Sequence, residues 1–217
     1  MLRRDHNLDA LRGAAAISVC LYHICFADHF MPQNSLLEKL AQFGDKGVQV
    51  FFILSGLVIP WSISFRKYDL KLIKEFLIRR FIRIQIPYMM ALIVTIFCYT
   101  LYIDPSLRIS TKSIIYNFTY WVPYSSESWI LNVAWTLGVE VQFYIILAFC
   151  FPFFSSNIFS IRILSLISLT SMSLIPVPEK IEAWYFFPTW SPFFAVGILI
   201  FLFKSEKISQ REFYTLF

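Results

Sequence analysis

The sequence predicts an all-α protein that crosses a membrane several times as a bundle of helices. Of its 217 residues, 58% are hydrophobic and only 15% are charged, which is more apolar surface than a soluble domain of this size buries in one core. Stretches without any Asp, Glu, Lys or Arg occur at residues 48–65, 84–103, 163–177 and 183–203. Their length and composition are typical of membrane-spanning helices.

Two further apolar stretches contain ionisable side chains. Residues 8–30 include His23, and residues 130–154 have Glu140 as their only charge. We therefore expect about six spans in a single membrane-embedded domain over residues 1–217. No polar region is long enough for an independent soluble fold.

The basic residues predict the orientation of these spans. If the N-terminus is cytoplasmic, 14 of the 19 Lys and Arg residues fall in cytoplasmic segments, as the positive-inside rule requires. The net charge of +5 is then a consequence of topology, and nucleic-acid binding is not needed to explain it. Residues 66–83 form an amphipathic basic stretch, which we expect to lie along the cytoplasmic surface.

A titratable group inside a membrane span is costly and is therefore a functional candidate. Arg12 and His23 are separated by 11 positions, which in an α-helix is three turns plus about 20° and a rise of about 16 Å. Both side chains should lie on one helix face. Arg12 could bind a phosphate-bearing donor, while neutral His23, deeper in the membrane, takes a proton as general base. In the alternative interpretation, His23 is a packing residue and Arg12 only a topology anchor.

Glu140 is the third titratable candidate. Tyr144 lies one helical turn further on, so the two side chains can form a hydrogen bond or orient a histidine on another helix. A buried carboxylate without a partner would be protonated, so we expect Glu140 to pair with Arg12, His23 or an arginine at the membrane edge.

The sequence lacks the motifs that would indicate several other classes of protein. The four cysteines form no C-x-x-C pair and the three histidines are scattered, so we expect neither a disulfide framework nor a metal site. The sequence has no glycine-rich phosphate loop and no G-x-S-x-G motif, which disfavours a nucleotide hydrolase and a serine hydrolase.

Four ordered sequence blocks resemble the signature blocks of the bacterial acyltransferase 3 family. They are LDALRGAAAISVCLYH at residues 8–23, GVQVFFILSGLVI at 47–59, RRFIRIQIPY at 79–88 and WTLGVEVQFY at 135–144. One block alone would be weak evidence, but four blocks in the family's order make the resemblance specific.

The resemblance implies a multi-pass enzyme of the bacterial inner membrane, with about ten helices in its transferase region. Such an enzyme moves an acyl group, often acetyl from acetyl-CoA, to a hydroxyl of a surface or exported carbohydrate. Acyl-CoA is then a co-substrate, and no permanently bound cofactor is expected. Because the sequence contains about six spans, we expect it to be an N-terminal portion of the transferase region.

The resemblance also implies roles for individual residues. Arg12 and His23 match the R-x10-H motif of the first helix, and Glu140 matches the W-x-L-x-x-E block, so these three are the predicted catalytic residues. The predicted coenzyme-binding residues are Ser55 in the F-F-x-x-S-G block and the basic pair Arg80 and Arg83.

Each coenzyme-binding residue also has a structural interpretation. Ser55 and Gly56 lack bulk, which permits either the approach of a thioester or simple helix packing. Arg80 and Arg83 either meet the coenzyme's phosphates at the cytoplasmic face or anchor the chain to lipid.

Two other functions for the whole chain remain open at this stage. A transporter or flippase for a lipid-linked glycan would also need buried polar groups. The chain could also be a truncated, inactive membrane protein.

Overall fold

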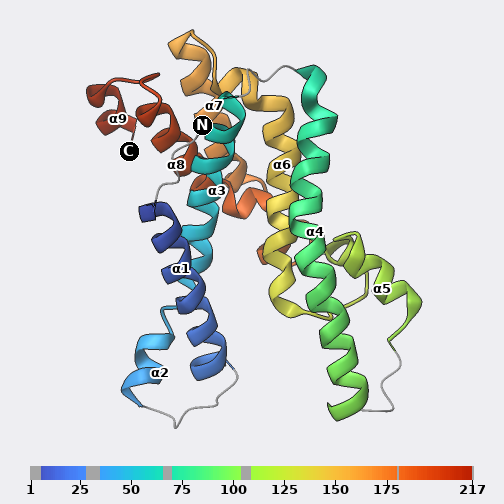
Figure 1. The fold of residues 1–217 in the computed structure, drawn as a ribbon. Coiled ribbons are helices and arrows are strands. Elements are labelled where there is room, and N and C mark those ends of the chain that lie inside the picture. The colour runs from blue at the N-terminus through green and yellow to red at the C-terminus, as the bar shows by residue number, and fades with distance from the viewer. Residues whose placement is uncertain (1–5, 28–34, 66–69, 104–108, 180, 217) are drawn as a thin grey trace.

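The computed structural model describes residues 6–27, 35–65, 70–103, 109–179 and 181–216, and the regular structure in these ranges is helical (Figure 1). The α-helices are α1 (His6–Leu21), α2 (Leu36–Ala41), α3 (Lys46–Ser64), α4 (Ile73–Cys98), α5 (Thr111–Phe118), α6 (Trp135–Phe154), α7 (Phe159–Ser171), α8 (Phe187–Lys204) and α9 (Gln210–Leu216). Turns of π-helix continue α1 and α4, and short 3-10 helices precede α6 and α8.

The structure confirms an all-α bundle of apolar helices. Among the described residues, five segments are long and apolar enough to cross a membrane: His6–Cys25, Leu36–Ser64, Ile73–Leu101, Asn132–Phe154 and Phe187–Lys204. The remaining predicted span, residues 163–177, corresponds to a shorter apolar segment, Phe159–Leu174. The last part of the predicted first span, residues 28–30, lies outside the described residues.

Each helix contacts the next one in the series α1, α3, α8, α7, α6 and α4. In addition, α3 contacts α6 directly. In Figure 1, α1 and α4 run down the page, whereas α3 and α6 run up it. We call the end where α4 begins the basic end, because Arg80 and Arg83 lie in this half of α4. The opposite end, where α6 and α8 begin, we call the aromatic end, after Trp135, Trp184 and Trp190.

Helices α3 and α8 make the closest contact in the bundle. A Cβ atom added to Gly197 would lie 2.1 Å from the carbonyl oxygen of Ile53, and one added to Gly56 would lie 2.3 Å from that of Phe194. These distances leave no space for a side chain, so glycine is required on both helices. Gly56 therefore serves helix packing, as the structural interpretation of this position predicted.

Stacked aromatic rings extend this contact to α6. The rings of Phe52 on α3 and Phe194 on α8 lie 4.8 Å apart between centroids, and Phe143 on α6 lies 4.2 Å from Phe194. All three side chains are buried, and offset stacking adds to the free energy gained by their burial. Helices α3, α6 and α8 thus form the rigid part of the bundle, which we call the scaffold.

Helix α4 contains most of the basic stretch predicted at residues 66–83. Residues 66–69 are outside the described residues, but α4 begins at Ile73 and continues without a break to Cys98. Residues 73–83 are therefore continuous with the apolar segment that follows them, in one helix. No glycine or proline interrupts the helix formers between Ile73 and Pro87, and Pro87 itself lies inside the helix.

The second half of α4 is anchored to α5. The side chain of Gln85 donates to the carbonyl oxygen of Phe118 at 3.1 Å, and the hydroxyl of Tyr88 donates to that of Asn117 at 3.1 Å. The fully buried Asn117 side chain itself makes three hydrogen bonds, to the carbonyl oxygens of Ser113 and Ser128 and from the amide of Ile130. This network fixes the α5 region against the aromatic end of α4.

Tyr120 ends this region in an unusual conformation. Its φ angle is 57°, and the amide of Trp121 donates to the carbonyl oxygen of Tyr116 at 2.9 Å, as in a Schellman motif at a helix C-terminus. Glycine is usual at this position, but the ring of Tyr120 stacks on Tyr88 at 5.2 Å. Burial raises the pKa of the Tyr120 hydroxyl, so the side chain is neutral at physiological pH.

Cations hold the end of α6 at the basic end. The guanidinium of Arg162 donates to the carbonyl oxygen of Ser156 at 2.6 Å, and the ammonium of Lys207 donates to that of Ser155 at 2.6 Å. Positive charge near a helix C-terminus is favourable. Burial, and to a lesser extent the nearby charge of Arg162, lowers the pKa of Lys207.

Candidate active site

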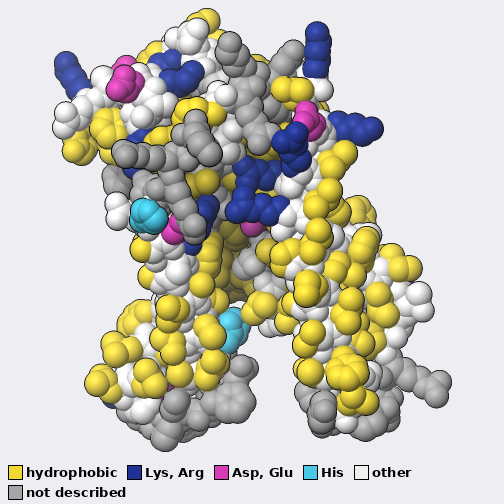
Figure 2. All heavy atoms as spheres, in the orientation of Figure 1, with side chains coloured by type: hydrophobic (Ala, Val, Ile, Leu, Met, Phe, Trp, Pro, Cys, Tyr) yellow, Lys and Arg dark blue, Asp and Glu magenta, His cyan; other side chains and the backbone are white. Residues whose placement is uncertain are grey.

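A cavity of about 850 Å³ is lined by residues of α1, α3, α4 and α6. Figure 2 shows this hollow between the two sides of the molecule, with Lys and Arg side chains gathered near its upper end. All six predicted site residues line this one cavity, although they come from four helices: Arg12, His23, Ser55, Arg80, Arg83 and Glu140.

Arg12 and His23 both face the cavity from the first helix. Arg12 lies in α1 with its guanidinium 4.0 Å from the carboxylate of Asp9. His23 lies in the π-helical turn Tyr22–Ala27 that continues α1, and its ring meets that of Tyr22 edge to face at 5.3 Å. The helix therefore presents a cation nearer the basic end and an imidazole nearer the aromatic end.

Glu140 on α6 accepts two hydrogen bonds on the same oxygen. The hydroxyl of Ser55 on α3 donates to Oε1 at 3.0 Å, and the hydroxyl of Tyr144 donates to it at 2.6 Å. The bond with Tyr144 is the one expected from the one-turn spacing. Ser55 was not among the partners that the sequence suggested, because it lies 85 residues away on another helix.

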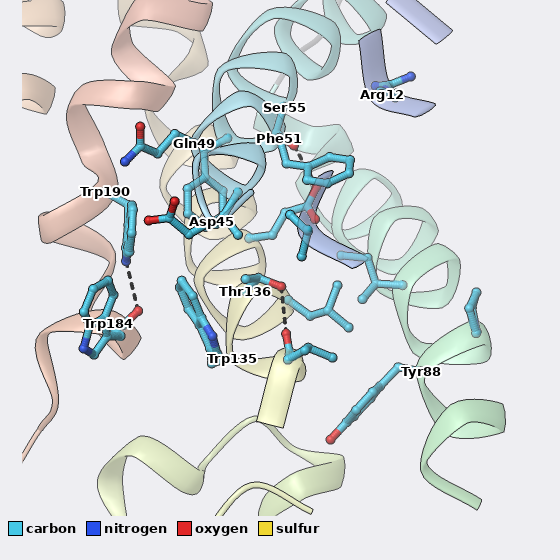
Figure 3. A pocket seen from close by; sticks show the side chains of 18 of the residues that line it. Arg12, Asp45, Gln49, Phe51, Ser55, Tyr88, Trp135, Thr136, Trp184 and Trp190 are labelled. Atoms are coloured by element: carbon cyan, nitrogen blue, oxygen red, sulfur yellow. Dashed lines mark hydrogen bonds between the residues drawn. The ribbon is translucent and has the colours of Figure 1, made fainter. Parts of the chain in front are cut away.

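This arrangement fixes the side chain of Ser55. The bond to Glu140 joins two scaffold helices, and Ser55 faces the cavity while its neighbour Gly56 packs on α8. Figure 3 shows Ser55 and Phe51 on the wall formed by α3, with the dashed bond from Ser55. The two residues of the Ser-Gly pair thus have different environments.

Arg80 and Arg83 line both the main cavity and a second cavity of about 360 Å³. The guanidinium of Arg80 donates to the hydroxyl of Ser62 and lies 5.9 Å from the ring centre of Phe76. The second cavity also includes Arg79, whose guanidinium pairs with Glu75. The basic end therefore has several cations at the junction of two cavities.

Aromatic residues surround the opposite end of the main cavity. Figure 3 shows Trp135, Trp184 and Trp190 grouped on the side away from Arg12, with Asp45 and Gln49 of the α3 region above them. All five line the cavity. Sequence analysis did not select these residues, although tryptophans next to a span at a membrane interface gave a weak signal.

Neither His6 nor any of the four cysteines lines this cavity. His6 is exposed and does not line the cavity, and His29 lies outside the described residues. The four cysteines are free. Among the described residues, no group of three or more His, Cys, Asp and Glu side chains could hold a metal ion.

Comparison with known proteins assigns the family. The family model described as an acyltransferase domain, of the acyltransferase 3 type, matches residues 5–217. The chain belongs to the acyltransferase 3 family. The resemblance of the four sequence blocks to this family is thereby confirmed.

Curated relatives include two bacterial O-acetyltransferases. The chain is 29% identical over 155 residues to the peptidoglycan O-acetyltransferase OatA of Listeria monocytogenes. The aligned region covers 64% of the chain and 23% of the relative. It is 30% identical over 190 residues to the O-acetyltransferase OatA of Staphylococcus aureus. Here the aligned region covers 79% of the chain and 29% of the relative. The matches thus span about a quarter of the length of these relatives. No solved structure gives a significant match.

Proposed function

We propose that this chain transfers an acyl group, with acetyl-CoA as the donor, to a hydroxyl group of a cell-surface or exported carbohydrate. The observation that supports this proposal most directly is that the six predicted residues from four helices line one cavity. The printed names of the two relatives, both O-acetyltransferases and one acting on peptidoglycan, support the reaction type and the class of acceptor.

In this proposal the coenzyme enters at the basic end. Arg80 and Arg83 bind its phosphates, because guanidinium groups form paired, charge-assisted hydrogen bonds with phosphate oxygens. Ser62, the partner of Arg80, lies seven residues from Ser55 on α3, a rise of about 10 Å along the helix. The extended arm of the coenzyme is long enough to bring its thioester from the arginines to the level of Ser55.

The chemical step is a direct acyl transfer. His23 removes the proton of the acceptor hydroxyl as that oxygen attacks the thioester carbonyl carbon. The carbon–sulfur bond then breaks, and the coenzyme leaves as a thiol after taking up the proton from His23. An ester forms and no oxidant or reductant is needed.

Arg12, Ser55 and Glu140 assist this step. The positive charge of Arg12, at the cavity wall nearer the basic end, attracts the anionic donor. Ser55 lines the cavity, and because its hydroxyl donates its only proton to Glu140, its role is to position that carboxylate beside the thioester. Glu140, which accepts from Ser55 and Tyr144, holds these two hydroxyls in place.

We place the basic end at the cytoplasmic side of the bacterial inner membrane. The positive-inside bias of the sequence supports this orientation, and acyl-CoA is a cytoplasmic metabolite. The acceptor then reaches the cavity from the aromatic end, across the membrane from the coenzyme.

The substitution His23→Ala tests the proposal, with His6→Ala as a matched control on the same helix. Purified protein in lipid nanodiscs is supplied with radiolabelled acetyl-CoA and a peptidoglycan oligosaccharide, and labelled sugar is measured. Loss of a general base should lower transfer about a hundredfold to ten-thousandfold, whereas loss of the exposed His6 should leave transfer unchanged.

Two results would contradict the proposal. Transfer that persists in the His23→Ala protein would remove His23 from the mechanism. Wild-type protein that incorporates no label, but moves a lipid-linked glycan across a vesicle membrane, would instead identify a transporter.

A further inference from the structure

The aromatic end of the cavity contains three tryptophans from two separate segments. Ring centroids are 5.4 Å apart for Trp135 and Trp190, 5.9 Å for Trp184 and Trp190, and 6.4 Å for Trp135 and Trp184. The indole nitrogen of Trp190 donates to the carbonyl oxygen of Trp184 at 2.9 Å. This bond ties the loop before α8 to the helix, so the three rings form a fixed group.

These rings differ in how much they contribute to the core. Trp190 is 7% exposed and packs on Phe52 at 5.3 Å, which explains its presence structurally. Trp184 is 59% exposed and still lines the cavity. Tryptophans of a membrane-interface belt face lipid, whereas a ring that lines an internal cavity is available to a ligand.

A carboxylate faces the same part of the cavity. Asp45, just before α3, pairs through Oδ2 with the ammonium of Lys46 at 3.0 Å. Its other oxygen, Oδ1, is buried and has no hydrogen-bond partner among the described residues. Because Oδ1 is shielded, a ligand hydroxyl reaches the carboxylate at Oδ2, the oxygen that pairs with Lys46 on the exposed part of the side chain.

Gln49 adds a second polar group on the same wall. It follows Asp45 by one helical turn along α3, and both line the cavity. An amide both donates and accepts hydrogen bonds. The aromatic end thus combines flat apolar surfaces with polar groups that suit neighbouring hydroxyls.

Pyranose sugars have this combination of properties. One face of the ring presents C–H groups, which are attracted to the negative face of an aromatic ring, and its edge carries hydroxyls that donate to carboxylate and amide oxygens. A linear polyol has the same hydroxyls but no flat apolar face. A lipid tail would use the rings but not the polar groups.

We infer that Trp184, with Trp135, Asp45 and Gln49, forms a binding subsite for a pyranose unit of the acceptor. This inference rests on the proposed function, and it assigns the acceptor to the end of the cavity opposite Arg80 and Arg83. The sugar stacks on the exposed indole of Trp184, and Asp45 accepts a hydrogen bond from one of its hydroxyls. His23 lines the same cavity as this subsite.

Direct binding tests the subsite without requiring acyl transfer. Wild-type protein in nanodiscs is titrated with chitotetraose, a soluble β-1,4-linked N-acetylglucosamine oligomer, and with sorbitol, and binding is followed by saturation-transfer NMR. Trp184→Ala should weaken chitotetraose binding at least tenfold, and sorbitol should not compete. Trp121→Ala is the matched control, because Trp121 is 54% exposed and lies outside the cavity.

Asp45→Asn separates stacking from hydrogen bonding. It should weaken chitotetraose binding less than Trp184→Ala, because the rings remain. The subsite is wrong if the Trp184→Ala and wild-type proteins bind the sugar equally, if sorbitol competes as well as chitotetraose, or if the wild-type protein binds no sugar.

Acetyl transfer measured on the same variants distinguishes the subsite from the proposed function. Protein that binds chitotetraose through Trp184 but transfers no acetyl group retains the subsite and loses the proposed function. Protein that acetylates the sugar equally well with and without Trp184 retains the function and loses the subsite.

Discussion

The scaffold and the two outer helices differ sharply in how they are packed. Within the span windows, 61% of residues are buried in α8 and 44% in α6, against 17% in α4 and 11% in the α1 segment. The candidate site residues are divided between the same two parts of the molecule. Ser55 and Glu140, which bond to each other, belong to the scaffold, whereas His23 and the candidate arginines belong to α1 and α4.

This difference separates two requirements of the proposed reaction. Hydroxyl and carboxylate groups that must be oriented are placed where packing and hydrogen bonds fix them. The base and the phosphate-binding cations are on helices with few buried contacts, which rearrange at lower cost in free energy. Substitutions in the two parts should therefore change different properties, stability in the scaffold and ligand binding in the outer helices.

The largest effect is expected from Gly197→Ala in the scaffold. The new Cβ would lie 2.1 Å from the carbonyl oxygen of Ile53, so α3 and α8 must move apart, and the free energy of unfolding should fall by about 3 kcal/mol. Gly13→Ala on α1 is the control, since nothing lies within 4 Å of its Cβ position. Thermal unfolding in detergent measures both, and equal stability of the two variants would contradict the comparison.

A smaller effect is expected when Arg80 and Arg83 on α4 are both replaced by Gln. Coenzyme affinity should fall by about 2 kcal/mol, roughly thirtyfold, because charge-assisted bonds to phosphate are lost, while the unfolding temperature falls less than in Gly197→Ala because the bond from Arg80 to Ser62 is the contact removed. Isothermal titration with acetyl-CoA measures the affinity. Lys71→Gln combined with Lys74→Gln, two exposed positions at the start of the same segment, removes the same two charges, and an equal loss of affinity there would show that only the overall charge matters.

The smallest effect is expected from Tyr144→Phe. One of the two hydrogen bonds to Glu140 is lost, which should lower the free energy of unfolding by about 1 kcal/mol, while Ser55 remains bound and keeps Glu140 in place. Tyr214→Phe, at a position 71% exposed, should change nothing. If Tyr144→Phe abolished transfer without loss of stability, the hydroxyl would have a chemical role that the scaffold interpretation does not include.

The sequence predicted the features that depend on local spacing. Uncharged windows located the spans, and helical geometry brought Arg12 and His23 to one cavity and Glu140 next to Tyr144. The bond between Ser55 and Glu140 was not predictable in this way, because it depends on how α3 and α6 pack. Trp184 was missed because it falls inside the uncharged window 183–203 but lies in the short 3-10 helix Ala183–Tyr185 before α8, where only tertiary structure reveals that a side chain faces a cavity.

Pro87 makes α4 easier to bend at one level. Because proline has no N–H group, the carbonyl of Arg83 lacks its usual helical partner, so bending at this level costs one hydrogen bond less than elsewhere in the helix. The half after Pro87 is tied to α5 through Tyr88, and the half before it carries both candidate phosphate-binding arginines. Bending is thus easiest in the turn between Arg83 and Pro87, next to the bonds by which Gln85 and Tyr88 hold the helix to α5.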